Sequence, residues 1–130
     1  MENGIKELTK AEEQVMQILW KLKKAFVKDM VEYFADPKPA YNTVSTIIRI
    51  LEKKGFVSYK SYGKTYEYFP LISKNEYSDI YLGNFVKNYF GNSYKSLVSF
   101  FASGDTISIK ELEDMKQLVD KEIEKKKNNG

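Results

Sequence analysis

Residues 41–55 read Tyr-Asn-Thr-Val-Ser-Thr-Ile-Ile-Arg-Ile-Leu-Glu-Lys-Lys-Gly, and they decide the fold predicted for the chain. The apolar residues recur every three or four positions, as on one face of a helix: Val44, Ile47, Ile48 and Leu51. The opposite side is polar and basic: Asn42, Thr46, Arg49 and Lys53, with Ser45 at its edge. Gly55 can end the helix. Such a polar face suits the major groove of DNA, although an ordinary surface helix has the same pattern.

The residues after Gly55 change from a helical to an alternating pattern. Residues 56–62 and 65–69 alternate, and Gly63-Lys64 interrupts them, which predicts a β-hairpin with a glycine-containing turn. A hairpin after a helix with a polar face is typical of the wing of a winged helix-turn-helix. Lys60 and Lys64 near its tip are candidates for contacts with phosphates, and Tyr62 for packing on the DNA backbone. Simple solvation of these lysines on a hairpin edge is the alternative.

Two helices are predicted before residue 41. Thr9-Lys10-Ala11-Glu12 forms a capping box that opens a helix to about Lys23, and residues 23–27 are a break that can contribute a small strand. A shorter helix follows over residues 28–34, and the prolines in Asp36-Pro37-Lys38-Pro39 stop it. Three helices followed by a hairpin predict a winged helix-turn-helix domain over residues 1–72.

The C-terminal part is predicted to be helical. A capping box at residues 73–76 opens a helix to about Phe90, and a second at residues 108–111 opens a helix through Ile123. A short helix begins at Ser93 between them, and residues 125–130 are expected to be a frayed tail. Three helices of about fifty residues rarely form a core of their own. We therefore expect residues 73–130 to be a dimerisation domain, although folding back onto the N-terminal domain is the alternative. The candidate interface residues are Tyr81, Phe85, Tyr89, Leu97, Phe100, Phe101, Leu112, Met115 and Val119.

Composition restricts the chemistry. The chain contains neither cysteine nor histidine, which excludes disulfides, Cys/His zinc sites and catalysis by thiol or imidazole. The acidic pairs Glu12/Glu13 and Glu111/Asp114 are better explained by capping and helix dipoles than by a carboxylate enzyme. We expect no enzyme activity, no cofactor and no bound metal. The positive charge lies in the N-terminal part, where 13 of the 21 basic but only 9 of the 18 acidic residues precede Asn75. Without a signal peptide or an apolar run, the chain is expected to be cytoplasmic and not inserted in a membrane.

Four segments together resemble the penicillinase repressor family (BlaI/MecI/CopY type): residues 8–20, 41–60, 66–71 and 95–101. The resemblance covers about residues 6–121 and is most specific in the run ending at Trp20 and in the run from Leu51 to Phe56. It implies a mainly α fold with a small β-hairpin, in which an N-terminal winged helix-turn-helix precedes a C-terminal helical dimerisation domain. It also implies a dimeric repressor that binds palindromic operator DNA.

Three departures limit what the resemblance implies. The pair Asn42-Thr43 replaces the Lys-Thr with which family members that respond to β-lactams commonly open the helix, so no operator sequence is carried over. The copper-responsive members use C-terminal cysteines, which this chain lacks. Some members are induced when a membrane metalloprotease cuts an Asn-Phe bond. The matching bond here is Phe100-Phe101, whose missing Asn leaves recognition by such a protease open.

The function expected is therefore a dimeric DNA-binding transcriptional repressor. The residues expected to face bases are Asn42, Thr43, Ser45, Thr46 and Arg49. Those expected to contact phosphates are Lys53, Lys54, Lys60, Tyr62 and Lys64. A winged-helix module that binds another protein and no DNA is the alternative.

Overall fold

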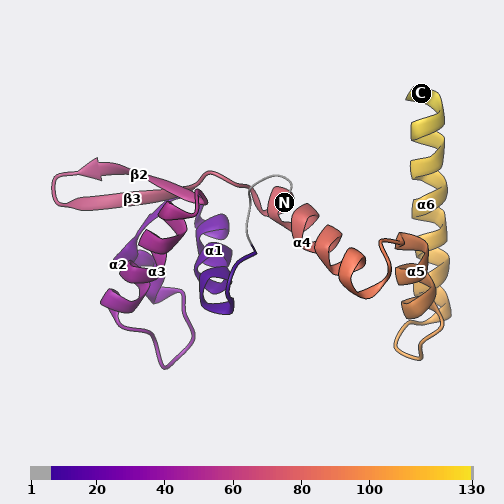
Figure 1. The fold of residues 1–130 in the computed structure, drawn as a ribbon, viewed down its shortest axis with the longest axis horizontal. Coiled ribbons are helices and arrows are strands. Elements are labelled where there is room, and N and C mark those ends of the chain that lie inside the picture. Colours follow the sequence, from indigo (N-terminus) through magenta and orange to yellow (C-terminus); the bar gives the residue numbers. More distant parts are fainter. Residues whose placement is uncertain (1–6, 130) are drawn as a thin grey trace. The chain divides into compact units, whose positions relative to one another are not determined.

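The computed structural model describes residues 7–129, which divide between Leu82 and Gly83 into two compact units, residues 7–82 and residues 83–129 (Figure 1). In the first unit, three helices precede a β-hairpin, as the sequence predicts. The elements of this unit are α1 (Lys10–Leu22), β1 (Ala25–Phe26), α2 (Val27–Glu32), α3 (Tyr41–Lys53), β2 (Val57–Tyr62), β3 (Thr65–Pro70) and the first part of α4 (Lys74–Tyr89).

The small sheet is antiparallel and has the order β1-β3-β2. The break after α1 supplies β1, which pairs Ala25 with Tyr68 and so adds a third strand to the hairpin. In the hairpin, Val57 pairs with Pro70 and Tyr62 with Thr65, which leaves a two-residue turn of Gly63 and Lys64. Gly63 has φ 63°, a conformation that glycine adopts without strain. The turn therefore places Lys64 at the tip of the wing.

The core lies between the three helices and the inner face of the sheet. The stripe predicted for α3 is largely correct, because Val44, Ile48 and Leu51 are fully buried and Ile47 packs at the margin of the core. These three residues meet fully buried side chains from the other elements: Val15, Met16, Leu19, Met30 and Phe56. The burial fixes which side of α3 faces inward, and so which side remains for a ligand.

The ends of α1 and α3 are defined by local hydrogen bonds. Thr9 and Glu12 form the predicted capping box, in which Thr9 N–H donates to Glu12 Oε1 at 3.0 Å and Glu12 N–H donates to Thr9 Oγ1 at 3.2 Å. At the end of α3, Gly55 has φ 85°, and the N–H of Phe56 donates to the carbonyl of Leu51 at 2.9 Å. The Gly55 turn directs the chain from α3 into β2.

The link between α2 and α3 begins earlier than expected. The structure places α2 at Val27–Glu32, where the sequence predicted residues 28–34. Lys38 explains how the chain leaves this helix, since its Nζ donates to the carbonyls of Glu32 and Phe34, each at 3.0 Å. The two contacts supply hydrogen-bond donors to carbonyls beyond which the helix offers no further N–H.

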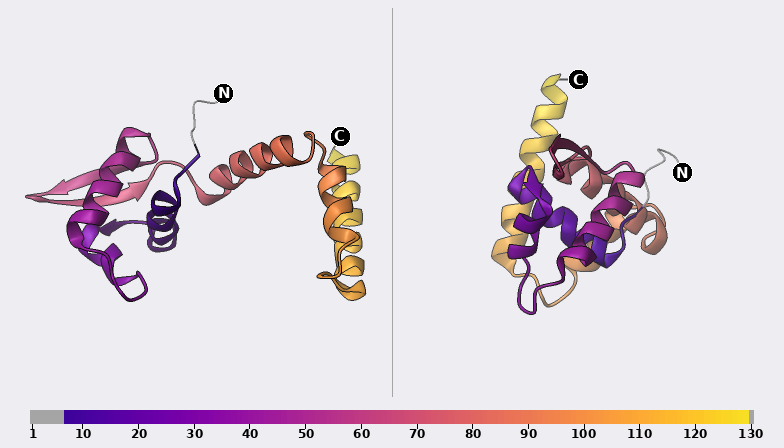
Figure 2. Two further views of the ribbon diagram at one scale, coloured as in Figure 1. Left: turned by 60° about the horizontal axis from the view of Figure 1, so that its bottom comes forward. Right: turned by 90° about the vertical axis from the view of Figure 1, so that its left-hand side faces the viewer.

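The second unit contains the remainder of α4, followed by α5 (Tyr94–Ala102) and α6 (Ile109–Asn129). Figure 1 and the left-hand view of Figure 2 show α5 lying alongside α6. Ser93 caps α5, and Ser108 and Glu111 form the predicted capping box of α6. The expectation of a frayed tail is wrong for residues 125–129, which continue α6 to Asn129.

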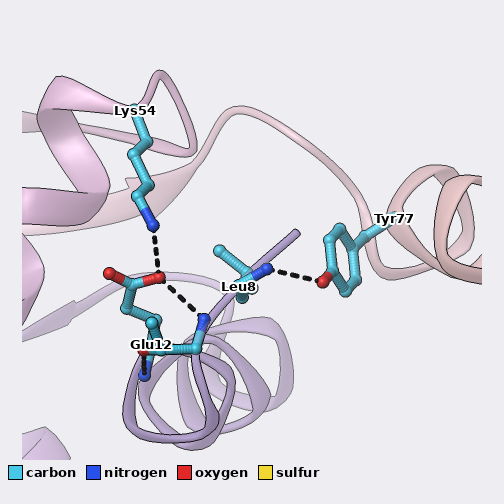
Figure 3. A network of polar contacts seen from close by, with 5 residues as sticks. Leu8, Glu12, Lys54 and Tyr77 are labelled. Atoms are coloured by element: carbon cyan, nitrogen blue, oxygen red, sulfur yellow. Dashed lines mark hydrogen bonds and ion pairs between the residues drawn. The ribbon is translucent and has the colours of Figure 1, made fainter. Parts of the chain in front are cut away.

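The two compact units meet within α4, at Leu82 and Gly83, whereas the sequence suggested a domain boundary at residues 72 and 73. Tyr77 explains the difference. Its ring centroid lies 5.7 Å from that of Phe56 and 6.1 Å from that of Trp20, and its hydroxyl accepts the N–H of Leu8 at 2.8 Å (Figure 3). The first turns of α4 therefore pack with the winged-helix unit. The division into a DNA-binding and a dimerisation domain remains a prediction.

Candidate nucleic-acid interface

The outer side of α3 presents the polar face that the sequence predicts. Asn42, Thr46, Arg49 and Lys53 are exposed, and Ser45 is half-buried at the edge. Thr46 Oγ1 donates to the carbonyl of Asn42 at 2.9 Å, so the hydroxyl proton is used inside the helix and its oxygen can still accept. Arg49 keeps an exposed guanidinium, which is the side chain on this face best suited to bind guanine with two hydrogen bonds.

Thr43 is separated from the other residues expected to face bases. It is exposed, but it borders a depression shared with Phe34, Pro39 and Ile47. Thr43 and Arg49 are six residues apart, and a helix turns about 100° per residue, so their side chains leave α3 in directions about 120° apart. The structure therefore does not bring Thr43 into the groove that contains Arg49.

A groove of about 370 Å³, here called the α3–wing groove, joins the helix to the hairpin. Ser45 and Arg49 line it from α3, and Lys64 and Tyr66 line it from the wing. Lys28, at the start of α2, adds a third cationic side chain, and the described lining residues include no Asp or Glu. A groove with basic side chains on both walls attracts a polyanion.

The other wing residues that the sequence singled out lie outside this groove. The Nζ of Lys60 lies 5.4 Å from the ring centroid of Tyr62, which itself packs against Phe26 at 5.9 Å. Lys60 pairs with Glu67 across the hairpin, so it faces away from Tyr66 and Tyr68 on the adjacent positions. Lys60 and Tyr62 are exposed on the opposite face of the wing.

Three tyrosines on the wing were not recognised as site residues from the sequence. Tyr59 and Tyr66 stack with centroids 4.2 Å apart, and Tyr59 lies 5.5 Å from Tyr68. Tyr66 and Tyr68 both line the α3–wing groove. Burial raises the pKa of the Tyr68 hydroxyl, with Glu52 adding to the shift and Arg49 opposing it, so this hydroxyl is neutral near pH 7. The signal in the sequence is the spacing of Tyr66 and Tyr68, two positions apart in one strand, which puts both rings on one face of the hairpin.

Lys54 does not fit the phosphate contact predicted for it, because its ammonium is already paired within the fold. Its Nζ lies 2.7 Å from Oε1 of Glu12 on α1 (Figure 3), and Glu12 is buried, at 5% exposure. Burial alone raises the pKa of Glu12, but hydrogen bonds from Lys54 and Thr9 and the charge of Lys54 outweigh it and leave the pKa below 4.5. Lys54 therefore ties α3 to α1 within the fold, while the preceding Lys53 remains exposed.

Several large apolar side chains are exposed on the second unit. Among the described residues 83–129, only Val86 is a buried hydrophobic side chain. Of the predicted interface residues, five are exposed: Tyr81 (48%), Phe85 (38%), Tyr89 (74%), Phe100 (69%) and Val119 (54%). The other four are half-buried: Leu97, Phe101, Leu112 and Met115. The bond between Phe100 and Phe101 lies inside α5.

Neither a metal-binding cluster nor a membrane-spanning helix occurs in the part of the chain that the structure describes. Between residues 7 and 129, no three acidic side chains are grouped so that they can hold a metal ion. Within the same residues, no helix combines the length and the apolar character needed to cross a bilayer.

Three helices, a polar outer face on the third and a two-stranded wing beside it define a winged helix-turn-helix. The family model for the penicillinase repressor matches residues 8–121, and the chain belongs to this family. Members of the family are DNA-binding transcriptional repressors rather than enzymes, so the expected class of protein is confirmed.

Individual relatives match over nearly the whole chain. The methicillin resistance regulatory protein MecI of Staphylococcus aureus (strain N315) is 29% identical over 122 residues, which cover 93% of this chain and 99% of MecI. The penicillinase repressor of Bacillus licheniformis is 23% identical over 95% of this chain and 97% of its own. The solution structure of the DNA-binding domain of the repressor BlaI is 24% identical, has a TM-score of 0.49 and covers 56% of this chain and 90% of that domain.

Proposed function

We propose that this protein is a homodimeric repressor that binds a palindromic operator in double-stranded DNA. The observation that carries the proposal is the α3–wing groove, which joins Arg49 of the third helix to Lys64 of the wing without a lining carboxylate. In the proposed complex α3 enters the major groove, and Asn42, Ser45, Thr46 and Arg49 face the bases. Lys53 and Lys64, with Lys60 and Tyr62 on the other face of the wing, contact the sugar-phosphate backbone.

The structure suggests three changes to the set of residues predicted from the sequence. Lys28 and Tyr66 join the proposed contacts, because both line the α3–wing groove. Thr43 becomes a contact at the edge of the site, since it lies on another side of α3. Lys54 is left out because its ammonium is paired with Glu12.

The proposed dimer forms through the helices of the second unit. Its support is the exposure of large apolar side chains there, since Tyr89 and Phe100 are 74% and 69% exposed. Soluble proteins rarely leave such residues uncovered in groups. A two-fold dimer also presents two copies of α3 to two half-sites about one DNA turn apart. The proposal places the protein in the cytoplasm, where the chromosome of the bacterial relatives lies.

Footprinting tests the function directly. The purified protein is titrated onto the DNA upstream of its own gene, and we expect protection of a palindrome whose half-sites lie about one helical turn apart. The affinity should fall steeply as salt rises, because phosphate contacts release counterions. A protein that protects no site and whose duplex affinity is absent or insensitive to salt would instead be a protein-interaction module, the alternative function.

Induction by proteolysis is a further part of the proposal. The Phe100-Phe101 bond lies within α5, whose backbone is helical. A protease needs an extended substrate strand, so α5 must open locally before the bond is cut. Mass spectrometry of the protein from induced cells tests this, and we expect a fragment that ends at Phe100. An intact chain in induced cells would exclude cleavage at this bond.

A further inference from the structure

A second groove lies in the N-terminal unit and shares no lining residue with the α3–wing groove. It has a volume of about 950 Å³ and lies where the end of α1, the residue after α2 and the end of β3 come together. Tyr68 and Phe69 are adjacent in β3, and Tyr68 lines the α3–wing groove while Phe69 lines the second groove. The α3–wing groove uses the β3 residues Thr65, Tyr66 and Tyr68, whereas the second groove uses the last two residues of the strand, Phe69 and Pro70, so the two grooves are separate. One groove can therefore be occupied while the other holds DNA.

Aromatic side chains form the walls of the second groove. Trp20 is held in place by its indole N–H, which donates to the carbonyl of Ile72 at 2.8 Å, and by its contact with Tyr77 at 6.1 Å. Tyr33 and Phe69 are 52% and 37% exposed. The groove thus offers a fixed indole and two solvent-exposed rings as an apolar surface.

The charged residues that line the second groove are all basic. They are Lys21, Lys23 and Lys74, and the described lining residues include no Asp or Glu. The whole chain is nearly balanced, with 21 basic and 18 acidic residues, so this groove is more positive than the chain. The nearby carboxylate of Glu76 is engaged in the cap of α4, where its Oε1 accepts the N–H of Ser73 at 2.8 Å. The groove therefore complements a negatively charged ligand that has an apolar side chain.

We infer that the second groove docks an acidic segment of a partner protein, one that carries an aromatic or aliphatic residue between its carboxylates. An extended segment fits because the walls are exposed rather than enclosing. The apolar residue lies against Trp20 and Phe69, and the carboxylates meet the three lysines. The partner binds the repressor without displacing operator DNA, since the second groove shares no lining residue with the α3–wing groove.

Trp20 is the single tryptophan of the chain, so its fluorescence reports on this groove. The probe is the peptide acetyl-Glu-Glu-Phe-Glu-Glu-Leu-Glu-Glu-amide, titrated into the full-length protein. We expect a saturable change in Trp20 emission, which the same peptide with Gln in place of every Glu does not produce. Replacing Phe and Leu of the peptide by Ala should weaken binding.

Two double variants locate the binding site. Lys21→Gln/Lys74→Gln should weaken binding of the peptide about tenfold, because it removes two of the three cationic side chains that line the groove. Lys10→Gln/Lys87→Gln removes the same charge outside the groove and should leave the affinity unchanged. Both variants should bind DNA like the wild type, and the peptide should bind equally well to the DNA complex.

Four results would overturn the inference. They are an absent change in emission, an equal response to the Gln peptide, an unchanged affinity in Lys21→Gln/Lys74→Gln, and displacement of the peptide by a short duplex DNA. The last result would assign the second groove to nucleic acid. Because the readout is the emission of Trp20 and not DNA binding, failure here leaves the proposed repressor function standing.

Discussion

The ammonium nitrogen of Lys54 lies 2.7 Å from Oε1 of Glu12, and this contact joins the end of α3 to the first turn of α1 (Figure 3). The same oxygen accepts the N–H of Thr9 at 3.0 Å, so one carboxylate serves both the cap of α1 and the ion pair. The side chains of Lys54 and Glu12 are 24% and 7% exposed. Removal of one partner would leave the other charge poorly solvated. The pair therefore helps to hold the end of α3 against α1.

A double-mutant cycle tests the pair. Glu12→Gln keeps an N3 residue that can complete the capping box and removes only the charge, and Lys54→Met keeps the aliphatic stem. Each single change should lower the free energy of unfolding by about 2 kcal/mol, because it leaves an unpaired charge. The double variant should lose less than the sum of the two, since it leaves no such charge. Urea denaturation measures all four proteins, and strictly additive losses would show that the two side chains do not interact.

The pH dependence of stability gives a separate prediction. The pKa of Glu12 is below 4.5 in the folded protein, because hydrogen bonds and the charge of Lys54 outweigh the effect of burial. A depressed pKa contributes stability that is complete above the unfolded pKa and is lost as the pH falls through the folded pKa. The difference in unfolding free energy between wild type and Glu12→Gln should therefore be constant near pH 7 and shrink below about pH 4.5. A difference that stays constant down to pH 3 would contradict a charge-based role.

Lys53 and Lys54 illustrate how far the sequence could predict the site. Capping boxes, the apolar stripe of α3 and the hairpin turn depend on residues a few positions apart, and these were predicted correctly. The two lysines are adjacent and chemically identical, yet a helix turns about 100° between them. Which of them meets a carboxylate depends on how α1 packs on α3, and Glu12 is 42 residues away from Lys54. Local patterns carry no information on that packing.

The α3–wing groove also depends on packing between segments that are distant in the sequence. Arg49 and Lys64 were both selected from the sequence for their charge and position, but their place on opposite walls of one groove depends on the fold of the hairpin over α3. Lys60 looked equivalent to Lys64 and lies on the other face of the wing. Tyr66 was overlooked because an alternating tyrosine in a hairpin is usually explained by packing between strands.

Arg49→Ala tests sequence reading. The guanidinium is exposed in the α3–wing groove, where it can bind guanine with two hydrogen bonds. We expect binding to the operator to lose about 1–3 kcal/mol, and discrimination at one base pair of each half-site to relax. Competition between the operator and single-base variants of it measures both effects. Lys53→Ala is the matched control, exposed one turn further along α3, and it should weaken all sequences alike. If Arg49→Ala also weakened operator and random DNA equally, the arginine would be a phosphate contact.

Lys64→Ala tests the wing. Because Lys64 is at the tip of the hairpin and lines the α3–wing groove, its loss should weaken operator and random duplex alike. The slope of log affinity against log salt should become shallower by about 1 for each wing on the DNA. Fluorescence anisotropy at several salt concentrations measures this slope. Lys87→Ala, an exposed lysine on α4, should leave it unchanged. An unchanged slope in Lys64→Ala would remove the wing tip from the DNA contacts.

Phe100→Glu tests the proposed dimer. Phe100 is 69% exposed in the single chain, where its ring meets that of Phe90 at 5.5 Å, so a glutamate there costs the monomer one ring contact, whereas in a dimer interface it would also bury an unpaired charge. We expect analytical sedimentation to show a dimer for the wild type, and a dimer dissociation constant at least about tenfold larger for Phe100→Glu. Ser99→Glu places the same charge on the neighbouring exposed position of α5 and should leave the dimer intact. Of the two variants, only Phe100→Glu should bind the full palindrome with an affinity close to that for a single half-site, because its two copies of α3 no longer bind together. A wild type that sediments as a monomer, or a Phe100→Glu protein that dimerises normally, would show that these apolar side chains serve another purpose.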